Sequence, residues 1–397
     1  MSKLNRTIGW KTYGLFGLGN IIGAGIYVLI GEVAGKAGNG AIWSFIVAGL
    51  VAGFTVVSYS ALATKFPLSA GEVVYVVKSF NARNLGLLIG ITLVFSGIVS
   101  GGALLNGFAN YASQLLQIPK PVYILAAAII LSVVAIKGIK ETAKLAVAIT
   151  LIEVVGLLII VGASLLSSGF STRAVEVLNT SLDIGALPIL LGGFLAFYAF
   201  IGFEDMVNVA EEVKNPTKNI KKGMFAAVTI AIVLYILVIM AALTSVPAAQ
   251  LAESDAPLST VFQRATNTTF PLIAIIGVFA IINGVLAQIV MGSRVLYGLS
   301  REKLILNWFG KVNSTTKTPI NSTILMGVLM LVAAISLPLV ALASLTSLAL
   351  LVIFSIVHAS CLKLRNQINI KPWIPATGLV LNTGIIIIQT SQWFNWL

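Results

Sequence analysis

The sequence predicts an all-α protein that crosses a membrane about eleven times. Its 397 residues are 58% hydrophobic and only 10% charged, with a mean hydropathy of +1.01, whereas a soluble domain carries about 25% charge. Apolar runs of about 20 residues, the length of a membrane-spanning helix, recur from end to end. The basic residues gather in alternate connecting segments, which is typical of a polytopic membrane protein.

The apolar runs predict the position of each span. The expected spans are roughly 8–34, 40–64, 85–117, 121–138, 143–168, 186–210, 223–246, 270–298, 321–338, 340–361 and 373–392. The pair Leu337-Pro338 separates the ninth span from the tenth, because proline interrupts the hydrogen bonding of a helix.

The lysines and arginines predict the orientation. With the N-terminus inside, all but four of the 25 basic residues lie in inner segments, and the exceptions are Lys36, Lys120, Arg173 and Arg264. This bias predicts a multi-pass protein of the cell (plasma) membrane with a cytoplasmic N-terminus. An odd number of spans then places the C-terminus outside. No cleavable signal peptide is expected, because the first apolar run has no small-residue cleavage site.

Composition excludes several function classes. The net charge of +12 is spread over short loops and forms no continuous basic face, so no nucleic acid partner is expected. The single cysteine, Cys361, excludes a disulfide framework and a redox pair. We find no metal-ligand set, no cofactor motif and no nucleophile–base pair, so we expect no metal, no cofactor and no enzyme. The expected partners are a small-molecule substrate and the lipid bilayer, and the oligomeric state stays open.

The first span contains a stretch that a continuous helix would not favour. Residues 17–27 read GLGNIIGAGIY, with Gly23, Ala24 and Gly25 at the middle of the apolar run. Each glycine inside a helix costs about 1 kcal/mol relative to alanine. Irregular backbone at membrane depth occurs only where it is buried in protein or lines a cavity. We therefore predict a broken helix that presents backbone amides and carbonyls to a ligand.

The sixth span carries a second interruption. Residues 195–206 read LAFYAFIGFEDM, in which Gly202 lies among aromatic residues and is followed by Glu204 and Asp205. Each carboxylate inside a span costs about 2.5–3.5 kcal/mol on insertion scales, so intramembrane acids suggest function. Spans one and six are corresponding members of two five-helix halves that run in opposite directions. Glycine-interrupted spans at corresponding positions point to the binding site of a transporter.

These patterns predict one transporter domain over residues 1–397. Its inverted repeats would cover roughly 8–168 and 186–361, and the span at 373–392 would lie outside them.

Three motifs resemble those of one transporter family. GLGNIIGAGIY (17–27) resembles the first-span signature of the amino acid–polyamine–organocation (APC) superfamily. FYAFIGFE (197–204), continuing into AEEVKNP (210–216), resembles its sixth-span signature, and GSRVLYGLSRE (292–302) resembles the end of its eighth span. The resemblance covers essentially the whole chain. It implies an amino acid permease with a LeuT-like fold, working by sodium-independent, proton-linked or exchange transport.

The chain departs from the family pattern in two places. The family usually has twelve spans, whereas eleven are expected here. Many members also carry a lysine in the fifth span whose ammonium stands in for a sodium ion, and here Glu153 occupies that position.

The half-helix ends suit a zwitterionic substrate. The free N–H groups at the N-terminal end of a helix attract anions, so amides near Gly23, Ala24, Gly25 and Ile26 would hold a carboxylate. Carbonyls near Ile21 and Ile22, and those of Phe200, Ile201 and Gly202, would accept an ammonium. The resemblance implies that Tyr198 and Phe200 cover the substrate side chain. The alternatives are a glycine notch for helix packing and plain core packing of the aromatics.

Two acids are candidates for coupling. Glu204 matches a family position tied to proton or conformational coupling, and Asp205, which points about 100° away along a helix, ranks below it. Glu153 is predicted to be a proton acceptor or a cation ligand beside the break in span one. The alternative for each is a buried carboxyl that only makes hydrogen bonds.

We therefore expect a secondary active transporter of amino acids that works by alternating access. Coupling would be to protons or to a counter-substrate, by symport or antiport. Spans three, eight and ten show no obvious acidic pocket residue, which favours neutral substrates. Alternatives are a polyamine or amine exchanger, a channel-like pore and a non-transporting amino acid sensor.

Overall fold

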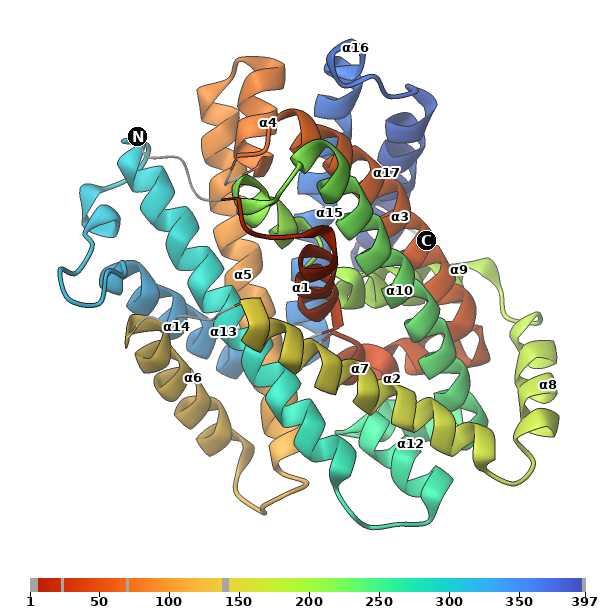
Figure 1. Cartoon of the computed structure of the whole chain (residues 1–397). Coiled ribbons are helices and arrows are strands. Elements are labelled where there is room, and N and C mark those ends of the chain that lie inside the picture. Colours follow the sequence, from red (N-terminus) through yellow and green to blue (C-terminus); the bar gives the residue numbers. More distant parts are fainter. Residues whose placement is uncertain (1–5, 23–24, 69–70, 138–142, 395–397) are drawn as a thin grey trace.

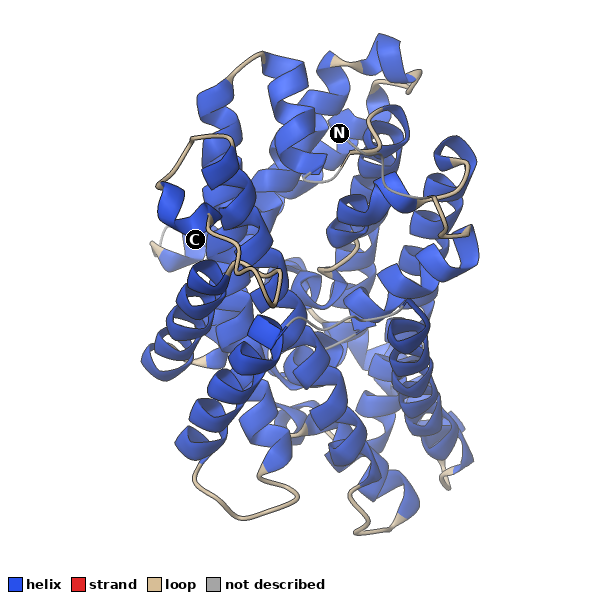
Figure 2. Ribbon diagram, turned by 60° about the vertical axis from the view of Figure 1, so that its left-hand side comes forward, coloured by secondary structure: helices blue, strands red, loops and turns tan. Residues whose placement is uncertain are grey.

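The computed structural model describes residues 6–22, 25–68, 71–137 and 143–394, and all regular elements in them are helices (Figures 1 and 2). Nine helical segments in this part of the chain are long and apolar enough to cross a membrane, and one of them, Gly25–Lys65, contains two spans. A shorter apolar helix of 17 residues, Ile320–Ser336, follows the eighth span. Together with the half-helix Trp10–Ile22, these elements form the eleven expected spans. The prediction of an all-α membrane protein is confirmed.

The spans follow one another in chain order. They are α1 (Trp10–Ile22) with α2 (Gly25–Ala37), α3 (Ala41–Lys65), α5 (Arg83–Ala112), α6 (Lys120–Lys137), α7 (Ala143–Leu166), α9 (Ala186–Phe197) with its continuation, α10 (Pro216–Ser245), α13 (Leu272–Arg301), α14 (Ile320–Ser336), α15 (Leu339–Lys363) and α17 (Trp373–Trp393). The tenth span begins directly after Pro338, as predicted.

Short helices connect the spans, and the sequence analysis did not anticipate them. They are α4 (Gly71–Phe80), α8 (Phe170–Ser181), α11 (Ala248–Glu253), α12 (Pro257–Thr266) and α16 (Arg365–Ile368), with the 3₁₀ turns η1 (Gly38–Gly40) and η4 (Asn307–Gly310). These segments mix polar and apolar residues, so a search for continuous apolar runs passes over them. Figure 1 shows α4 and α16 toward one end of the molecule and α12 toward the other, which agrees with the predicted inner and outer segments.

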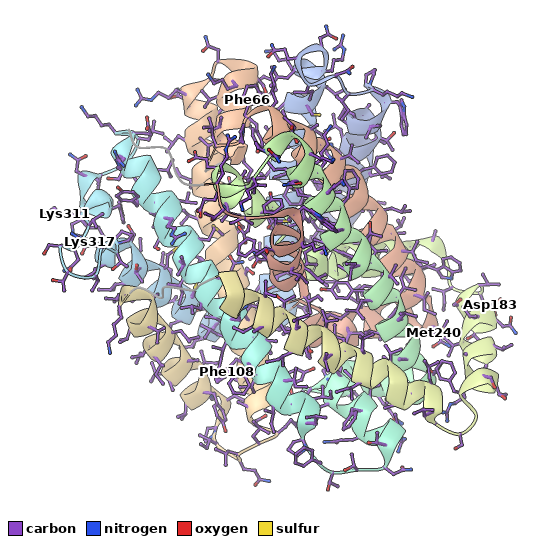
Figure 3. All side chains as sticks on the ribbon, viewed as in Figure 1. Phe66, Phe108, Asp183, Met240, Lys311 and Lys317 are labelled. Carbon is purple, nitrogen blue, oxygen red and sulfur yellow. The ribbon has the colours of Figure 1, made fainter. Side chains whose placement is uncertain are left out.

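Several charged side chains lie at the periphery of the bundle. Figure 3 shows Lys311 and Lys317 at one edge and Asp183 at another, and all three are exposed. Long apolar side chains such as Leu88 and Ile129 are also more than half exposed, which suits a surface that faces lipid tails.

Inside the bundle, helices of the first half pack against helices of the second half in a symmetric pattern. The first half-helix, α1, packs against α10 of the seventh span, and α9 of the sixth span packs against α3 of the second. In the same way α3 contacts α10, and α5 contacts α13. Each partnership therefore recurs when first-half and second-half elements are exchanged. The two interrupted spans lie side by side at the centre, because α2 also packs against α9.

Candidate functional site

The described part of the first span consists of α1, which ends at Ile22, and α2, which begins at Gly25. Gly23 and Ala24, the predicted centre of the break, lie outside the described residues. Gly25 meets the sixth span so closely that a Cβ there would stand 2.4 Å from Cα of Ala199. Only glycine permits this approach, so the close contact of the two broken spans depends on it.

The sixth span breaks in two steps. After α9 the chain forms a single 3₁₀ turn, η2 (Tyr198–Phe200), becomes extended at Ile201, and resumes as the 3₁₀ helix η3 (Glu204–Glu212). Gly202 has φ +121°, a conformation that side-chain-bearing residues rarely adopt. A Cβ on Gly202 would stand 2.4 Å from the backbone oxygen of Asn20. The predicted break at this glycine is therefore present, and it fits against the end of α1.

Glu204 satisfies the backbone at this break. Its Oε2 accepts a hydrogen bond of 2.8 Å from the amide of Gly202, and the side chain is 5% exposed. The adjacent Phe203 packs its ring 5.8 Å from the ring of Tyr59 and 5.4 Å from that of Phe354. The start of η3 is thus held by one polar and several aromatic contacts.

Tyr235 of α10 joins the two broken spans. Its hydroxyl lies 2.8 Å from the carbonyl oxygen of Ile21 and 2.9 Å from that of Ala199. One hydroxyl proton is shared between two carbonyls, and each carbonyl keeps a lone pair for another donor. The ring of Phe200 packs against the ring of Tyr235 with centroids 5.0 Å apart. Tyr235 therefore fixes the relative position of the two breaks.

The inner ends of the two spans are tied as well. The amide of Ile8 donates to the carbonyl of Glu212 (3.0 Å), and the amide of Lys214 donates to the carbonyl of Ile8 (2.9 Å). The hydroxyl of Tyr13 donates to the carbonyl of Met206 at 3.0 Å. The segment before α1 and the end of η3 therefore form one connected unit.

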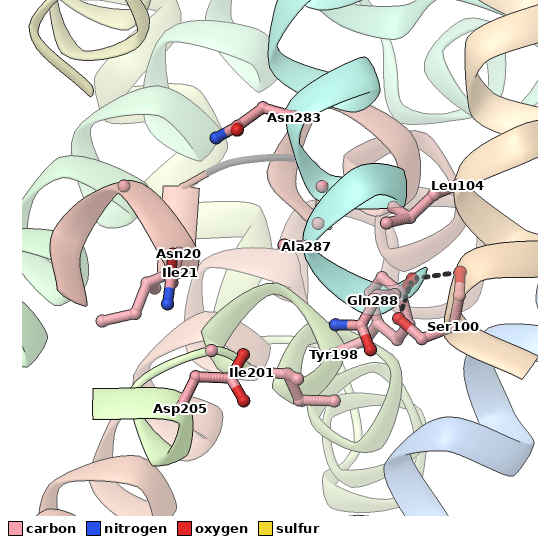
Figure 4. Close-up of a pocket in the computed structure, with 14 residues that line it drawn as sticks. Asn20, Ile21, Ser100, Leu104, Tyr198, Ile201, Asp205, Asn283, Ala287 and Gln288 are labelled. Atoms are coloured by element: carbon pink, nitrogen blue, oxygen red, sulfur yellow. Dashed lines mark hydrogen bonds between the residues drawn. The ribbon is translucent and has the colours of Figure 1, made fainter. Parts of the chain in front are cut away.

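A small pocket lies between the end of α1, the start of α2 and the break in the sixth span (Figure 4). The space in it that is open to water-sized molecules is about 40 Å³. Its lining comes from both broken spans, from α5 and from α13, and consists of Gly19, Asn20, Ile21, Gly25, Ser100, Leu104, Tyr198, Ile201, Gly202, Asp205, Asn283, Gly284, Ala287 and Gln288. The hydroxyls of Tyr198 and Ser100 lie 3.1 Å apart and connect the sixth span to α5.

Half of the residues predicted to bind substrate line this pocket. They are Ile21, Gly25, Tyr198, Ile201 and Gly202. Ile22, Ile26 and Phe200 are fully buried and lie outside the lining, while Gly23 and Ala24 fall outside the described residues. The expectation that Phe200 covers the substrate side chain finds no support, because its ring packs against Tyr235.

Several other lining residues were not among the predicted site residues, although two of the spans that carry them were expected to contribute. Spans three and eight contribute, as expected, through Ser100 and Leu104 and through Asn283 and Gln288, whereas span ten contributes no residue to the described lining. Amide side chains inside the otherwise apolar α13 were a usable signal. No comparable signal marked Leu104.

The two acids after Gly202 differ in whether they line the pocket. Asp205 lines the pocket, and Glu204 does not. In a 3₁₀ helix consecutive side chains point about 120° apart, so the two adjacent acids face different directions. Which of the two faces the pocket depends on how η3 packs. The ranking of Glu204 above Asp205 concerned coupling and stays a prediction.

Glu153 lies outside the pocket, in the middle of α7. Its side chain is 1% exposed, and both carboxyl oxygens are buried without a hydrogen-bond partner in the described structure. The carboxyl is close enough to the hydroxyls of Tyr27 and Tyr235 to interact with them electrostatically. Glu153 thus lies on a helix that packs against α1.

Glu72 is a further buried acid, located on α4 outside the membrane-spanning helices. It is 2% exposed, and burial raises its pKa from 4.5 to about 7, with the negative charge of Asp205 as an additional cause. A carboxyl with a raised folded-state pKa stabilises the protein below the unfolded value, and this contribution is lost as pH rises through the folded value. A shift of this size corresponds to about 3 kcal/mol.

We therefore expect the melting temperature of the purified protein to fall between about pH 5 and pH 8. Replacing Glu72 with Gln should reduce this fall, because the amide does not ionise. Thermal unfolding in detergent across this pH range measures the effect, and Glu176→Gln on exposed α8 is the control. An unchanged pH slope in Glu72→Gln would contradict the assignment.

Comparison with known proteins finds membrane transporters that are similar over most of the chain. Residues 8–392 match the family model described as amino acid permease. The chain is 30% identical over 425 residues to a methylthioribose transporter of Bacillus subtilis, covering 99% of this chain and 88% of that protein. It is 28% identical over 395 residues to a branched-chain amino acid permease of the same organism, covering 92% and 82%.

A plant relative is similar at a comparable level. The chain is 28% identical over 370 residues to a mitochondrial cationic amino acid transporter of Arabidopsis thaliana, and the match covers 88% of this chain and 60% of that one. The three relatives are named for chemically different substrates.

Proposed function

We propose, from the premise that this chain belongs to the amino acid permease family, that it carries amino acids through the membrane by alternating access. Family membership by itself shows a multi-pass transporter of amino acids or related solutes, and not an enzyme. The mechanism, the coupling and the substrate are the proposal. The observation that carries it is the pocket at the junction of two broken spans.

The pocket offers complementary groups to a zwitterion. Gly25, the first residue of α2, lines it, so the free amides at this helix N-terminus face a substrate carboxylate. Gly23, Ala24 and Ile26 belong to the same proposed amide group. The carbonyls at the end of α1 and around Ile201 provide acceptors for the substrate ammonium. Both charged groups of an amino acid would thus be bound at helix ends, without a basic side chain.

Alternating access would use the two five-span halves. We propose that these are the repeats over roughly 8–168 and 186–361, with α17 outside them. The exchange-symmetric packing of α1 on α10 and α9 on α3 supports this division. Rocking of one helix bundle against the other would expose the pocket first to one side and then to the other. We place the protein in the cell membrane with the N-terminus inside, as the distribution of lysine and arginine favours.

Coupling is proposed to run through Glu153, with Glu204 in a conformational role. An ionised carboxylate buried without a partner is strongly unfavourable, so Glu153 requires a proton or another cation whenever it is enclosed. The Glu204 carboxylate accepts a hydrogen bond from the amide of Gly202 at the break, so movement of η3 would change this hydrogen bond. Symport with protons and exchange against an internal amino acid both fit this arrangement.

A ligand screen followed by a flux measurement tests the proposal. The purified protein is heated with single amino acids, polyamines or methylthioribose, and a ligand at about 100 times its Kd adds about 2.7 kcal/mol of stability. Counterflow of each stabilising ligand is then measured in proteoliposomes. Saturable counterflow of an amino acid is expected. Stabilisation without flux would show a sensor, and stabilisation by polyamines alone would show an amine exchanger, and either would overturn the proposal.

A further inference from the structure

One carboxylate in the pocket has no partner in the described structure. Asp205 lines the pocket from the first turn of η3, and among the described residues its side chain makes no hydrogen bond or ion pair. Its neighbour Glu204 is engaged with the amide of Gly202. Within the described part of the chain, Asp205 is therefore a candidate for binding a ligand group.

The surroundings of Asp205 are polar and negatively charged. Figure 4 shows its carboxylate in the same part of the pocket as Ile201 and the amide of Gln288, with Asn283 farther away. The buried acids Glu72 and Glu204 interact electrostatically with it. No lysine or arginine is among the lining residues of the described pocket, so nothing there neutralises this negative charge.

A zwitterionic backbone does not need this carboxylate. The amides at the start of α2 suit the substrate carboxylate, and the carbonyls at the break ends suit the α-ammonium. Asp205 is then not needed for either the α-carboxylate or the α-ammonium. A carboxylate beside amide oxygens forms its strongest hydrogen bonds with ammonium or guanidinium donors. Spans three, eight and ten carry no acid in the pocket, and the acid that faces it is on span six.

We propose that Asp205 binds a cationic group on the substrate side chain, so that the preferred substrates are basic amino acids such as lysine and arginine. This inference rests on the proposed function of the pocket as an amino acid site. Gln288 and Asn20 would contribute amide oxygens to the same group. The substrate would contact α2 with its carboxylate and η3 with its side chain.

The first test uses the unchanged protein and two substrates of the same shape. Arginine and citrulline differ chiefly in the charge of the terminal group. Their affinities are measured by thermal shift and by competition with radiolabelled substrate in proteoliposomes. Losing the charge should weaken binding by about tenfold to a hundredfold. Equal affinity for arginine and citrulline would overturn the inference without depending on the folding of any variant.

The second test changes the carboxylate. Asp205→Asn should lower the affinity for lysine and arginine by about tenfold to a hundredfold and change that for alanine by less than about threefold. Asp183→Asn, on an exposed outer loop, is the matched control and should bind as the original protein does. An equal loss for lysine and alanine would show that Asp205 binds the α-ammonium or positions the break, and would overturn the assignment.

The binding results distinguish a wrong role for Asp205 from a wrong function of the pocket. If the protein binds alanine or leucine but neither lysine nor arginine, the role of Asp205 is wrong and the amino acid site stands. If it binds putrescine and no amino acid, the proposed function is wrong as well.

Discussion

Replacing Gly202 with alanine is expected to reduce transport to the background level of empty liposomes. The residue has φ +121°, where a side chain adds about 1–3 kcal/mol of strain. The added Cβ would also stand 2.4 Å from the backbone oxygen of Asn20, an atom that cannot move without shifting the end of α1. Both broken spans would be displaced together, and the pocket lies between them.

Gly162→Ala provides the matched control. Gly162 lies inside α7, and a Cβ there meets nothing within 4 Å. Alanine favours a helix over glycine by about 1 kcal/mol, so this variant should keep full transport and equal or higher stability. The comparison uses initial uptake rates in proteoliposomes together with melting temperatures. Normal uptake by Gly202→Ala would show that the break tolerates a side chain and that the close fit is not required.

Replacing Glu153 with Gln is expected to abolish uptake driven by a pH gradient while leaving counterflow of substrate intact. Both oxygens of this carboxyl are buried without a hydrogen-bond partner in the described structure. Glutamine has nearly the same shape and no charge, so folding should be preserved or slightly improved. A group that no longer exchanges a proton cannot link substrate movement to a proton gradient.

The measurement compares accumulation with and without an inside-alkaline gradient. Glu176→Gln on exposed α8 is the control and should retain the response of the original protein. A parallel experiment with an inward sodium gradient tests the other cation that a buried carboxylate can bind. If accumulation driven by the pH gradient persists in Glu153→Gln, then Glu153 is not the coupling residue.

Much of the architecture could be predicted from local sequence properties. Apolar runs located the eleven spans, because each must hide its backbone from lipid within one helix. Gly202 located the break in the sixth span, since glycine weakens a helix wherever it lies. Pro338 marked the start of the tenth span for a similarly local reason. The short helices α4, α8 and α12 were missed because their polar residues interrupt the apolar pattern on which the prediction relied.

The site was only partly predictable, because a pocket is defined by side chains from separate spans. Tyr235 reaches the carbonyls of Ile21 and Ala199 across a helix interface, and nothing near Tyr235 in the sequence indicates this. Phe200 turned out to pack against Tyr235 instead of facing the pocket. Ser100 and Gln288 line the pocket because α5 and α13 face the breaks, which only helix packing determines.

Local features of the sequence were enough to predict that this protein spans a membrane, that its sixth span breaks at Gly202 and which family it resembles. These properties depend on composition, glycine positions and motifs, all of which act locally along the chain. The tertiary structure alone decided that Asp205, and not Glu204, faces the pocket, and that Glu153 lies buried on a helix that packs against α1. Adjacent residues on a helix point in different directions, and only the packing of η3 and α7 selects which direction meets the cavity.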